Sequence, residues 1–293
     1  TCASRGLRNN LLRGRSAEHI DLMMAGTLSF SRDMQTEETL SFFLSPPGQI
    51  VRQWESRLLD GMVEHVLGDR ALQIGLPLLD TLRANGMREH WLLLEKEPSE
   101  REEPLREDWH RVLALPEALP FANETFDLVV LPHSLDFSPA PQQLLSEAVR
   151  VLAPEGRLIL AGFNPLGLWW WRQQFVRFGC RPYLPPHTTP IGVPRLKDWF
   201  ALLGLTTQEG HFGIYRPARQ RLTTLNRWQW LDKAGDRWFP QCGNLYLLSA
   251  VKKIPGRIPP VAASFADTLS ALAGKAGQKT VPRPMSSKID TQP

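Results

Sequence analysis

A histidine and an aspartate follow a predicted buried strand and can together move a proton. Pro132-His133-Ser134 ends an apolar run, and Asp136 comes three residues after His133. An imidazole titrates near neutral pH, so His133 can accept a proton or orient a substrate, and Asp136 can orient the ring. A histidine that only packs at the edge of a cleft fits the same residues. We take His133 as the candidate catalytic residue beside that alternative.

These residues lie inside a predicted strand-helix-strand unit. Residues 126–131 are an apolar run typical of a strand buried on both faces, and the apolar spacing of residues 141–152 indicates a helix. Pro154-Glu155-Gly156 turns the chain into a second buried strand at residues 157–163. Two such strands joined by a helix form a parallel β-α-β unit. Ligands bind at the carboxyl ends of parallel strands, where His133 is expected.

The same stretch carries a series of short motifs. In chain order they are Leu119-Pro120-Phe121, Phe126-Asp127-Leu128-Val129, Glu147 before Arg150-Val151-Leu152, and Pro154-Glu155-Gly156. This series resembles the second half of a class I S-adenosylmethionine (SAM)-dependent methyltransferase domain of the type-11 family, and most closely a bacterial subgroup with a degenerate glycine motif. The resemblance implies an α/β fold. That fold is a Rossmann-like seven-stranded methyltransferase sheet, mostly parallel with an antiparallel last strand and with helices on both faces.

The resemblance places a cofactor loop after the first strand, residues 71–75. Family members have a GxGxG-like loop there, because the backbone must approach the amino acid part of SAM closely. Gly75 fits the first position, whereas Pro77 and Leu79 replace the other two glycines. Proline lacks an N–H and has a fixed φ, so this loop departs from the family's pattern. By resemblance, Ile74, Gly75 and Leu76 are the cofactor contacts.

The resemblance implies further cofactor contacts after strands two and three. The family's acid after strand two accepts hydrogen bonds from the ribose hydroxyls, and Glu95 matches it in type and place. A solvated charge at a strand end is the alternative. After strand three, Leu115 and Pro116 replace the family's adenine-binding aspartate and its neighbour. They lack the carboxylate and the N–H respectively, so apolar contact would carry adenine binding there.

Composition limits which partners, locations and metal sites the chain can have. The chain has 293 residues, 42% of them apolar and 22% charged, with a net charge of +4. Its basic residues are dispersed, so the sequence holds no strong nucleic-acid signal. No apolar run approaches the ~18 residues of a transmembrane helix, and no secretory signal is evident. The three cysteines show neither metal-ligand nor disulfide spacing, which predicts a cytoplasmic protein without a metal site.

The chain divides into unequal segments. Residues 1–33 read as a disordered N-terminal extension and residues 254–293 as a disordered tail, around a methyltransferase-like domain at 46–253. Within this domain, residues 167–240 hold a lid-like helix and an insertion. The three consecutive tryptophans Trp169–Trp171 cannot all face one core, so at least one should be exposed. A lid over the cleft, a plain core helix, membrane contact and base stacking all fit this helix.

Two functions from different classes fit these observations. The first is transfer of a methyl group from SAM to a small-molecule acceptor. The second is a methyltransferase-like protein without SAM binding that acts as a protein-interaction module. The departures at Pro77, Leu79, Leu115 and Pro116 motivate the second, since a fold does not determine a function. We predict the methyltransferase; the sequence identifies neither the acceptor nor the oligomeric state.

Overall fold

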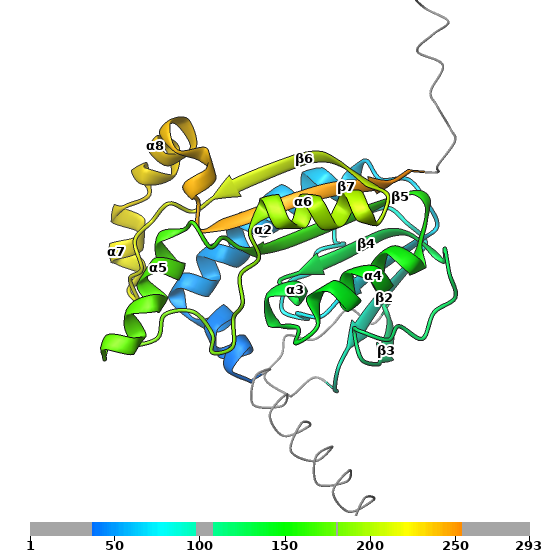
Figure 1. Cartoon of the computed structure of the whole chain (residues 1–293), viewed down its shortest axis with the longest axis horizontal. Coiled ribbons are helices and arrows are strands. Elements are labelled where there is room, and N and C mark those ends of the chain that lie inside the picture. Colours follow the sequence, from blue (N-terminus) through cyan, green and yellow to red (C-terminus); the bar gives the residue numbers. More distant parts are fainter. Residues whose placement is uncertain (1–36, 98–107, 180, 254–293) are drawn as a thin grey trace, which may run out of the picture. The chain divides into compact units, whose positions relative to one another are not determined.

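The computed structural model describes residues 37–97, 108–179 and 181–253, which are built around one seven-stranded sheet (Figure 1). The strands are β1 (Arg70–Ile74), β2 (Glu89–Leu94), β3 (His110–Leu113), β4 (Phe126–Pro132), β5 (Leu152–Phe163), β6 (Leu205–Gly213) and β7 (Leu245–Lys252). Their order is β3-β2-β1-β4-β5-β7-β6, and β7 is antiparallel to both of its neighbours. Strands β1 to β5 pair in parallel. The predicted fold class is confirmed.

Helices cover both faces of the sheet. In Figure 1, α3, α4 and α6 lie on the near face and α2 lies behind. The labelled helices are α2 (Pro46–Glu64), α3 (Ser134–Phe137), α4 (Pro141–Val151), α5 (Leu168–Gln174), α6 (Val193–Leu202), α7 (Leu222–Arg227) and α8 (Trp230–Trp238), with 3-10 turns η1 (Phe175–Phe178) and η2 (Pro240–Cys242), and residues 37–44 before α2 are also helical. Leu72 of β1 packs in the core cluster that holds α4 and α6, and its neighbour Ala71 packs in the cluster that holds α2. This follows because successive strand side chains point to opposite faces.

Element ends differ from the sequence predictions by a few residues. The predicted helix at 46–68 ends at Glu64, and the predicted tryptophan helix is divided between α5 and η1. The predicted turn at Pro154–Gly156 lies within β5, where Glu155 takes a positive φ of 62°. The predicted disordered segments at 1–33 and 254–293 lie outside the described residues.

Arg150 joins the end of α4 to the loop that leads into β4. Its guanidinium donates to the carbonyl oxygens of Leu119 and Phe121 and to both carboxylate oxygens of Glu147. Glu147 in turn accepts the Leu119 N–H at 3.0 Å. The hydrogen bond from Arg150 is the main cause that lowers the pKa of Glu147 below its ordinary value of 4.5. The motif residues before and after β4 thus hold the loop against the helix.

Replacing Arg150 tests this clamp. We expect Arg150→Ala to lower the free energy of unfolding by about 2 kcal/mol, because charged hydrogen bonds to two backbone carbonyls are lost. The contribution of the lowered Glu147 pKa is present above pH 4.5 and is lost as the pH falls through the folded-state value. Urea unfolding at pH 7 and at pH 3.5 measures both effects.

Arg157 provides the matched control. Its side chain is 30% exposed, against 31% for Arg150, and its ion pair with Glu209 spans 3.9 Å. Such a surface pair contributes about 0.5 kcal/mol or less. Equal losses in Arg150→Ala and Arg157→Ala would contradict the clamp.

Candidate functional site

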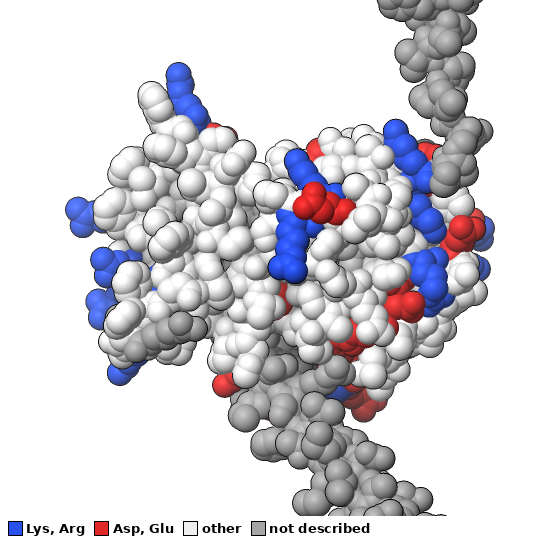
Figure 2. Space-filling model, in the orientation of Figure 1, with Lys and Arg blue, Asp and Glu red and all other residues white. Residues whose placement is uncertain are grey.

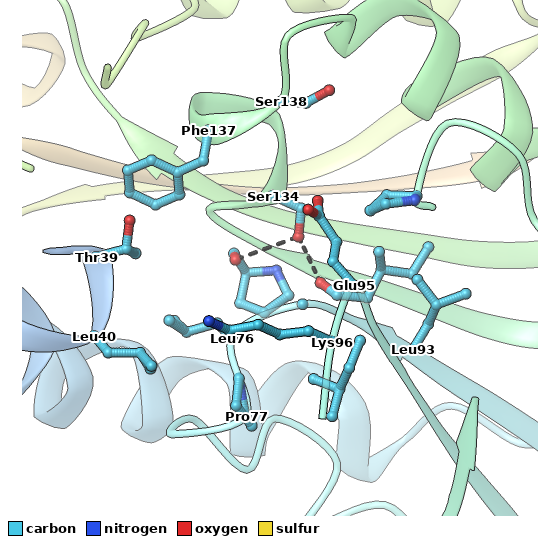
Figure 3. A pocket seen from close by; sticks show the side chains of 15 residues that line it. Thr39, Leu40, Leu76, Pro77, Leu93, Glu95, Lys96, Ser134, Phe137 and Ser138 are labelled. Carbon is cyan, nitrogen blue, oxygen red and sulfur yellow. Dashed lines mark hydrogen bonds between the residues drawn. The ribbon is translucent and has the colours of Figure 1, made fainter. Parts of the chain in front are cut away.

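A pocket opens at the carboxyl ends of β1, β2 and β4 (Figure 3). Its empty volume is about 860 Å³, including the space open to solvent. The lining is mostly apolar, as in small-molecule sites, with a few polar groups. It consists of Thr39, Leu40, Ile74, Gly75, Leu76, Pro77, Leu93, Leu94, Glu95, Lys96, Pro116, Pro132, Ser134, Phe137 and Ser138.

The loop after β1 forms one wall of the pocket through an unusual backbone. Gly75 has φ +76° and Leu76 has φ +38°, so two successive residues are left-handed. A Cβ on Gly75 would lie 3.2 Å from the Ser134 hydroxyl oxygen. Glycine avoids both the strain and the contact, whereas Leu76 takes the strained conformation without that freedom. Outliers of this kind persist where surrounding contacts hold them.

Gln73 provides those contacts from inside the sheet. Its side chain is fully buried in β1, and its amide nitrogen donates to the carbonyl oxygens of Gly75, Leu76 and Leu79 at 3.2, 3.0 and 2.8 Å. Its amide oxygen accepts the N–H and the hydroxyl of Thr81. One side chain therefore holds the loop in which the family resemblance predicted two more glycines. Gln73 was not predicted from the sequence, although a polar residue inside an otherwise apolar strand is a usable signal.

The loop's dependence on Gln73 can be measured. Gln73→Met keeps a similar side-chain length but leaves the loop carbonyls without their donor, so we expect the free energy of unfolding to fall by about 3 kcal/mol. Chemical denaturation gives this value. Gln142→Met, at an exposed position of α4, is the matched control and should change stability by less than about 0.5 kcal/mol. A Gln73→Met protein as stable as wild type would show that the loop holds itself.

Charged and hydroxyl groups face the pocket from the strand ends opposite the loop. Glu95 and Lys96 follow β2, and in Figure 3 Lys96 extends in the direction of Leu76. Ser134 donates its hydroxyl to the Ile74 carbonyl and so ties the end of β4 to β1. Ser138 donates its hydroxyl to the buried Glu117 carboxylate at 2.7 Å. Lys96, Ser134 and Ser138 were not singled out from the sequence.

The structure brings together most of the predicted cofactor contacts. Ile74, Gly75, Leu76, Glu95 and Pro116 all line the pocket, whereas Leu115 is 49% exposed and is not part of the lining. Their part in binding stays a prediction. No residue of the predicted lid segment, 167–240, lines this pocket among the described residues; Thr39 and Leu40 before α2 and Phe137 of α3 do instead. Trp169 is buried and Trp171 is 60% exposed, as the tryptophan run required.

His133 lies beneath the pocket wall and not in it. The ring is fully buried, and its Nδ1 is 3.0 Å from Asp136 Oδ2 while its Nε2 is 2.7 Å from Glu55 Oε1. Asp136 Oδ2 also accepts the Phe163 N–H. Catalysis by His133 stays a prediction, but a ring with both nitrogens engaged and no exposed atom is built to hold α2, α3 and β5 together. Glu55 was not foreseen from the sequence.

The two carboxylates determine the charge of this histidine. Burial by itself lowers the pKa of His133, but the charge of Glu55 and the hydrogen bond with Asp136 outweigh it and raise the pKa from 6.5 to about 9. Burial raises the pKa of the Asp136 carboxyl. The remaining oxygens, Glu55 Oε2 and Asp136 Oδ1, find no hydrogen-bond partner among the described residues. His133 is thus an imidazolium at neutral pH, which is a poor general base.

This assignment predicts a pH-dependent stability. Folded His133 keeps its proton to about pH 9, whereas the unfolded chain releases it near 6.5, so its stabilisation is complete below pH 6.5 and is lost as the pH rises toward 9. The loss should reach up to about 3 kcal/mol. Nuclear magnetic resonance titration of the seven histidines should show one midpoint near pH 9.

Two variants test whether Glu55 causes the raised pKa of His133. Glu55→Gln removes the facing charge, so the high midpoint should move to lower pH, while the Asp136 carboxyl stays in place. His211→Gln, at a half-exposed position of β6, should leave that midpoint unchanged. The assignment fails if every histidine titrates below pH 7.5.

Comparison with known proteins agrees with this architecture. Residues 93–160 match the family model described as a methyltransferase domain, which confirms the family resemblance over that segment. The chain is 30% identical over 152 residues to the uncharacterized protein YafS of Escherichia coli (strain K12), covering 52% of this chain and 59% of YafS. It is 45% identical over 49 residues to the ubiquinone/menaquinone biosynthesis C-methyltransferase UbiE of Roseobacter denitrificans, covering 17% of this chain and 20% of UbiE. The chain thus spans less than two thirds of either relative.

A solved structure shares the fold at greater length. It is a chain in the complex between the Haloferax volcanii Trm112 methyltransferase activator and a candidate methyltransferase. The two chains superpose with a TM-score of 0.51 at 15% identity, over 74% of this chain and 97% of the other. At this identity the likeness concerns the fold. In the described part of this chain, no helix has the length and apolar character needed to cross a bilayer.

Proposed function

We propose, from the match of residues 93–160 to the methyltransferase domain family, that this chain transfers a methyl group from SAM to a small-molecule acceptor. One observation carries the proposal. The left-handed loop at Gly75 and Leu76 and the Glu95 carboxylate line one largely apolar pocket at the carboxyl ends of the strands. This is where open α/β sheets bind nucleotide-like ligands.

The residues present fit the parts of SAM. The Glu95 carboxylate can accept hydrogen bonds from two vicinal hydroxyls, as on a ribose. Leu94 and Pro116 offer apolar surface for a purine ring. The absence of a side chain at Gly75 leaves room for a ligand's polar end beside Ser134. Glu95 and Lys96 are the only Asp, Glu, Lys or Arg side chains that line the pocket in the described chain, so the site is not strongly cationic.

The chain's own contribution to the reaction is positional. When bound, SAM would supply a methyl group on a positively charged sulfur. Leu76, Pro77 and Phe137 would exclude water from the reacting atoms, and Thr39 offers a hydroxyl to orient an acceptor. Holding two reactants in line converts a bimolecular step into a unimolecular one, which supplies much of the rate enhancement without a general base. That role suits a site whose histidine is buried and charged.

The interaction-module alternative is favoured by missing hydrogen-bonding groups. Pro77 and Pro116 line the pocket and offer no N–H, and Leu115 lacks the carboxylate that the family resemblance predicts for adenine. Leu79, in contrast, turns its side chain into the core cluster that holds α2, so it does not obstruct the pocket. Ligand binding distinguishes the two functions. The predicted cytoplasmic location belongs equally to both.

Calorimetric titration of SAM and S-adenosylhomocysteine tests the proposal. We expect micromolar binding to wild-type protein, which corresponds to roughly −8 kcal/mol. Glu95→Ala should weaken it roughly ten- to hundredfold, because hydrogen bonds to a charged acceptor contribute about 1.5–3 kcal/mol.

The control is on the same strand. Glu89→Ala removes a carboxylate from the amino end of β2, where it pairs with Arg70, far along the strand from the pocket. Binding by this variant should equal wild type. No heat from folded wild-type protein at millimolar ligand would refute the enzyme and favour the interaction module.

A further inference from the structure

The elements after β5 and after β6 meet in one region, which we call the aromatic lobe. It comprises residues 165–179, with α5 and η1, and residues 213–244, with α7, α8 and η2. Figure 1 shows α5, α7 and α8 gathered beyond the sheet end to which β6 points. Trp169 fixes the two parts to each other, since it is buried and its indole N–H donates to the Arg216 carbonyl at 2.8 Å. The two segments of the lobe are therefore packed together as an ordered part of the fold.

Large apolar side chains are exposed on this lobe far more than elsewhere. Seven aromatic side chains stand among the strongly exposed large apolar residues of the described chain, and all seven belong to the lobe. Phe178, Trp238 and Phe239 are 81%, 71% and 68% exposed. No residue of α8 is buried, although the helix runs for nine residues. Exposed apolar patches of this kind mark interaction surfaces.

Positive charge surrounds the exposed rings. The two segments of the lobe hold eight Lys or Arg and only two acids, Asp232 and Asp236, so the lobe is more positive than the whole chain at +4. Asp232 is engaged with the Arg216 guanidinium at 2.8 Å. Figure 2 shows Lys and Arg at the edge of a largely uncharged surface over these helices. The occupant of the surface should therefore be both apolar and anionic.

A local hollow between α7 and α8 combines these two properties. It is lined by Thr223, Thr224, Arg227, Trp228 and Trp230, and the two indole rings lie 6.1 Å apart between centroids. Guanidinium and hydroxyl groups bind phosphate oxygens, and indole rings are favoured at the boundary between headgroups and acyl chains. This hollow matches the headgroup region of a phospholipid layer.

We propose that the aromatic lobe docks the protein onto the surface of an anionic lipid bilayer. The rings and leucines such as Leu168 enter the boundary region, and Arg227 and its basic neighbours contact headgroup phosphates. A second copy of the chain fits less well, because like faces would bring their positive charges together. Single-stranded nucleic acid matches the charge but leaves exposed aliphatic residues such as Leu166 and Leu222 without an apolar partner.

Co-sedimentation of the full chain with vesicles tests the proposal. The vesicles are phosphatidylcholine alone or a three-to-one mixture of phosphatidylcholine with phosphatidylglycerol. We expect at least tenfold tighter partitioning to the anionic mixture, which weakens as salt is raised. Arg227→Gln should reduce that partitioning roughly fivefold. The paired change Phe178→Ser with Trp238→Ser should reduce partitioning to both vesicle types.

An exposed leucine outside the aromatic lobe provides the control. Leu67→Ser, at a 91% exposed leucine between α2 and β1, should leave partitioning unchanged. Equal losses in this variant, or no sedimentation with anionic vesicles, would overturn the proposal. Dimerisation or oligonucleotide binding that depends on Trp238, in a protein that does not bind vesicles, would also overturn the proposal. Circular dichroism confirms folding of each variant, and SAM titration is a separate measurement, so failure of the proposed methyl transfer leaves this test intact.

Discussion

A charged histidine enclosed by two carboxylates holds together the end of this sheet where the pocket opens. Removing ions from water costs several kcal/mol each, so His133 is tolerated in the core only because Glu55 and Asp136 face its two nitrogens. These groups come from α2, from the end of β4 and from α3, and Asp136 also accepts the N–H of Phe163 at the end of β5. Elements distant in sequence are thereby fixed at the edge where the pocket opens. The pocket's shape therefore depends on His133, which does not itself line the pocket.

The loop after β1 reaches a left-handed conformation without two of the three glycines that the family resemblance predicted there. Two of the expected glycines are Pro77 and Leu79, yet Gly75 and Leu76 still adopt positive φ. Gln73 compensates from the buried face of the strand, where one amide satisfies several loop carbonyls and Thr81. A buried amide behind a loop can thus hold a left-handed backbone that a glycine fingerprint would otherwise permit.

The sequence predicted the sheet well because both of its faces are buried. Continuous apolar runs such as residues 126–131 and the helical spacing of 141–152 determine element type without reference to the rest of the chain. The pocket was half foreseen, since Gly75 and Glu95 follow strands whose order the family resemblance implied. The roles of Glu55 and Gln73 were not predicted from the sequence, because they depend on partners up to 78 residues away or on a loop geometry that no local pattern specifies. His133 was correctly placed at a strand end, but its exposure depended on how α2 packs over it.

The order of strands has a consequence for how this chain is made. Strands β1 to β5 find parallel neighbours among segments synthesised before them or soon after, so most of the sheet can assemble while synthesis continues. β6 is different, because within the described residues it pairs with β7 alone, and β7 also covers the free edge of β5. Between the emergence of β6 and that of β7, the nascent chain carries an unpaired strand and an open sheet edge, the state in which strands pair wrongly with other chains. Pairing of β7 with both neighbours thus removes the unpaired strand and the open edge of β5 together.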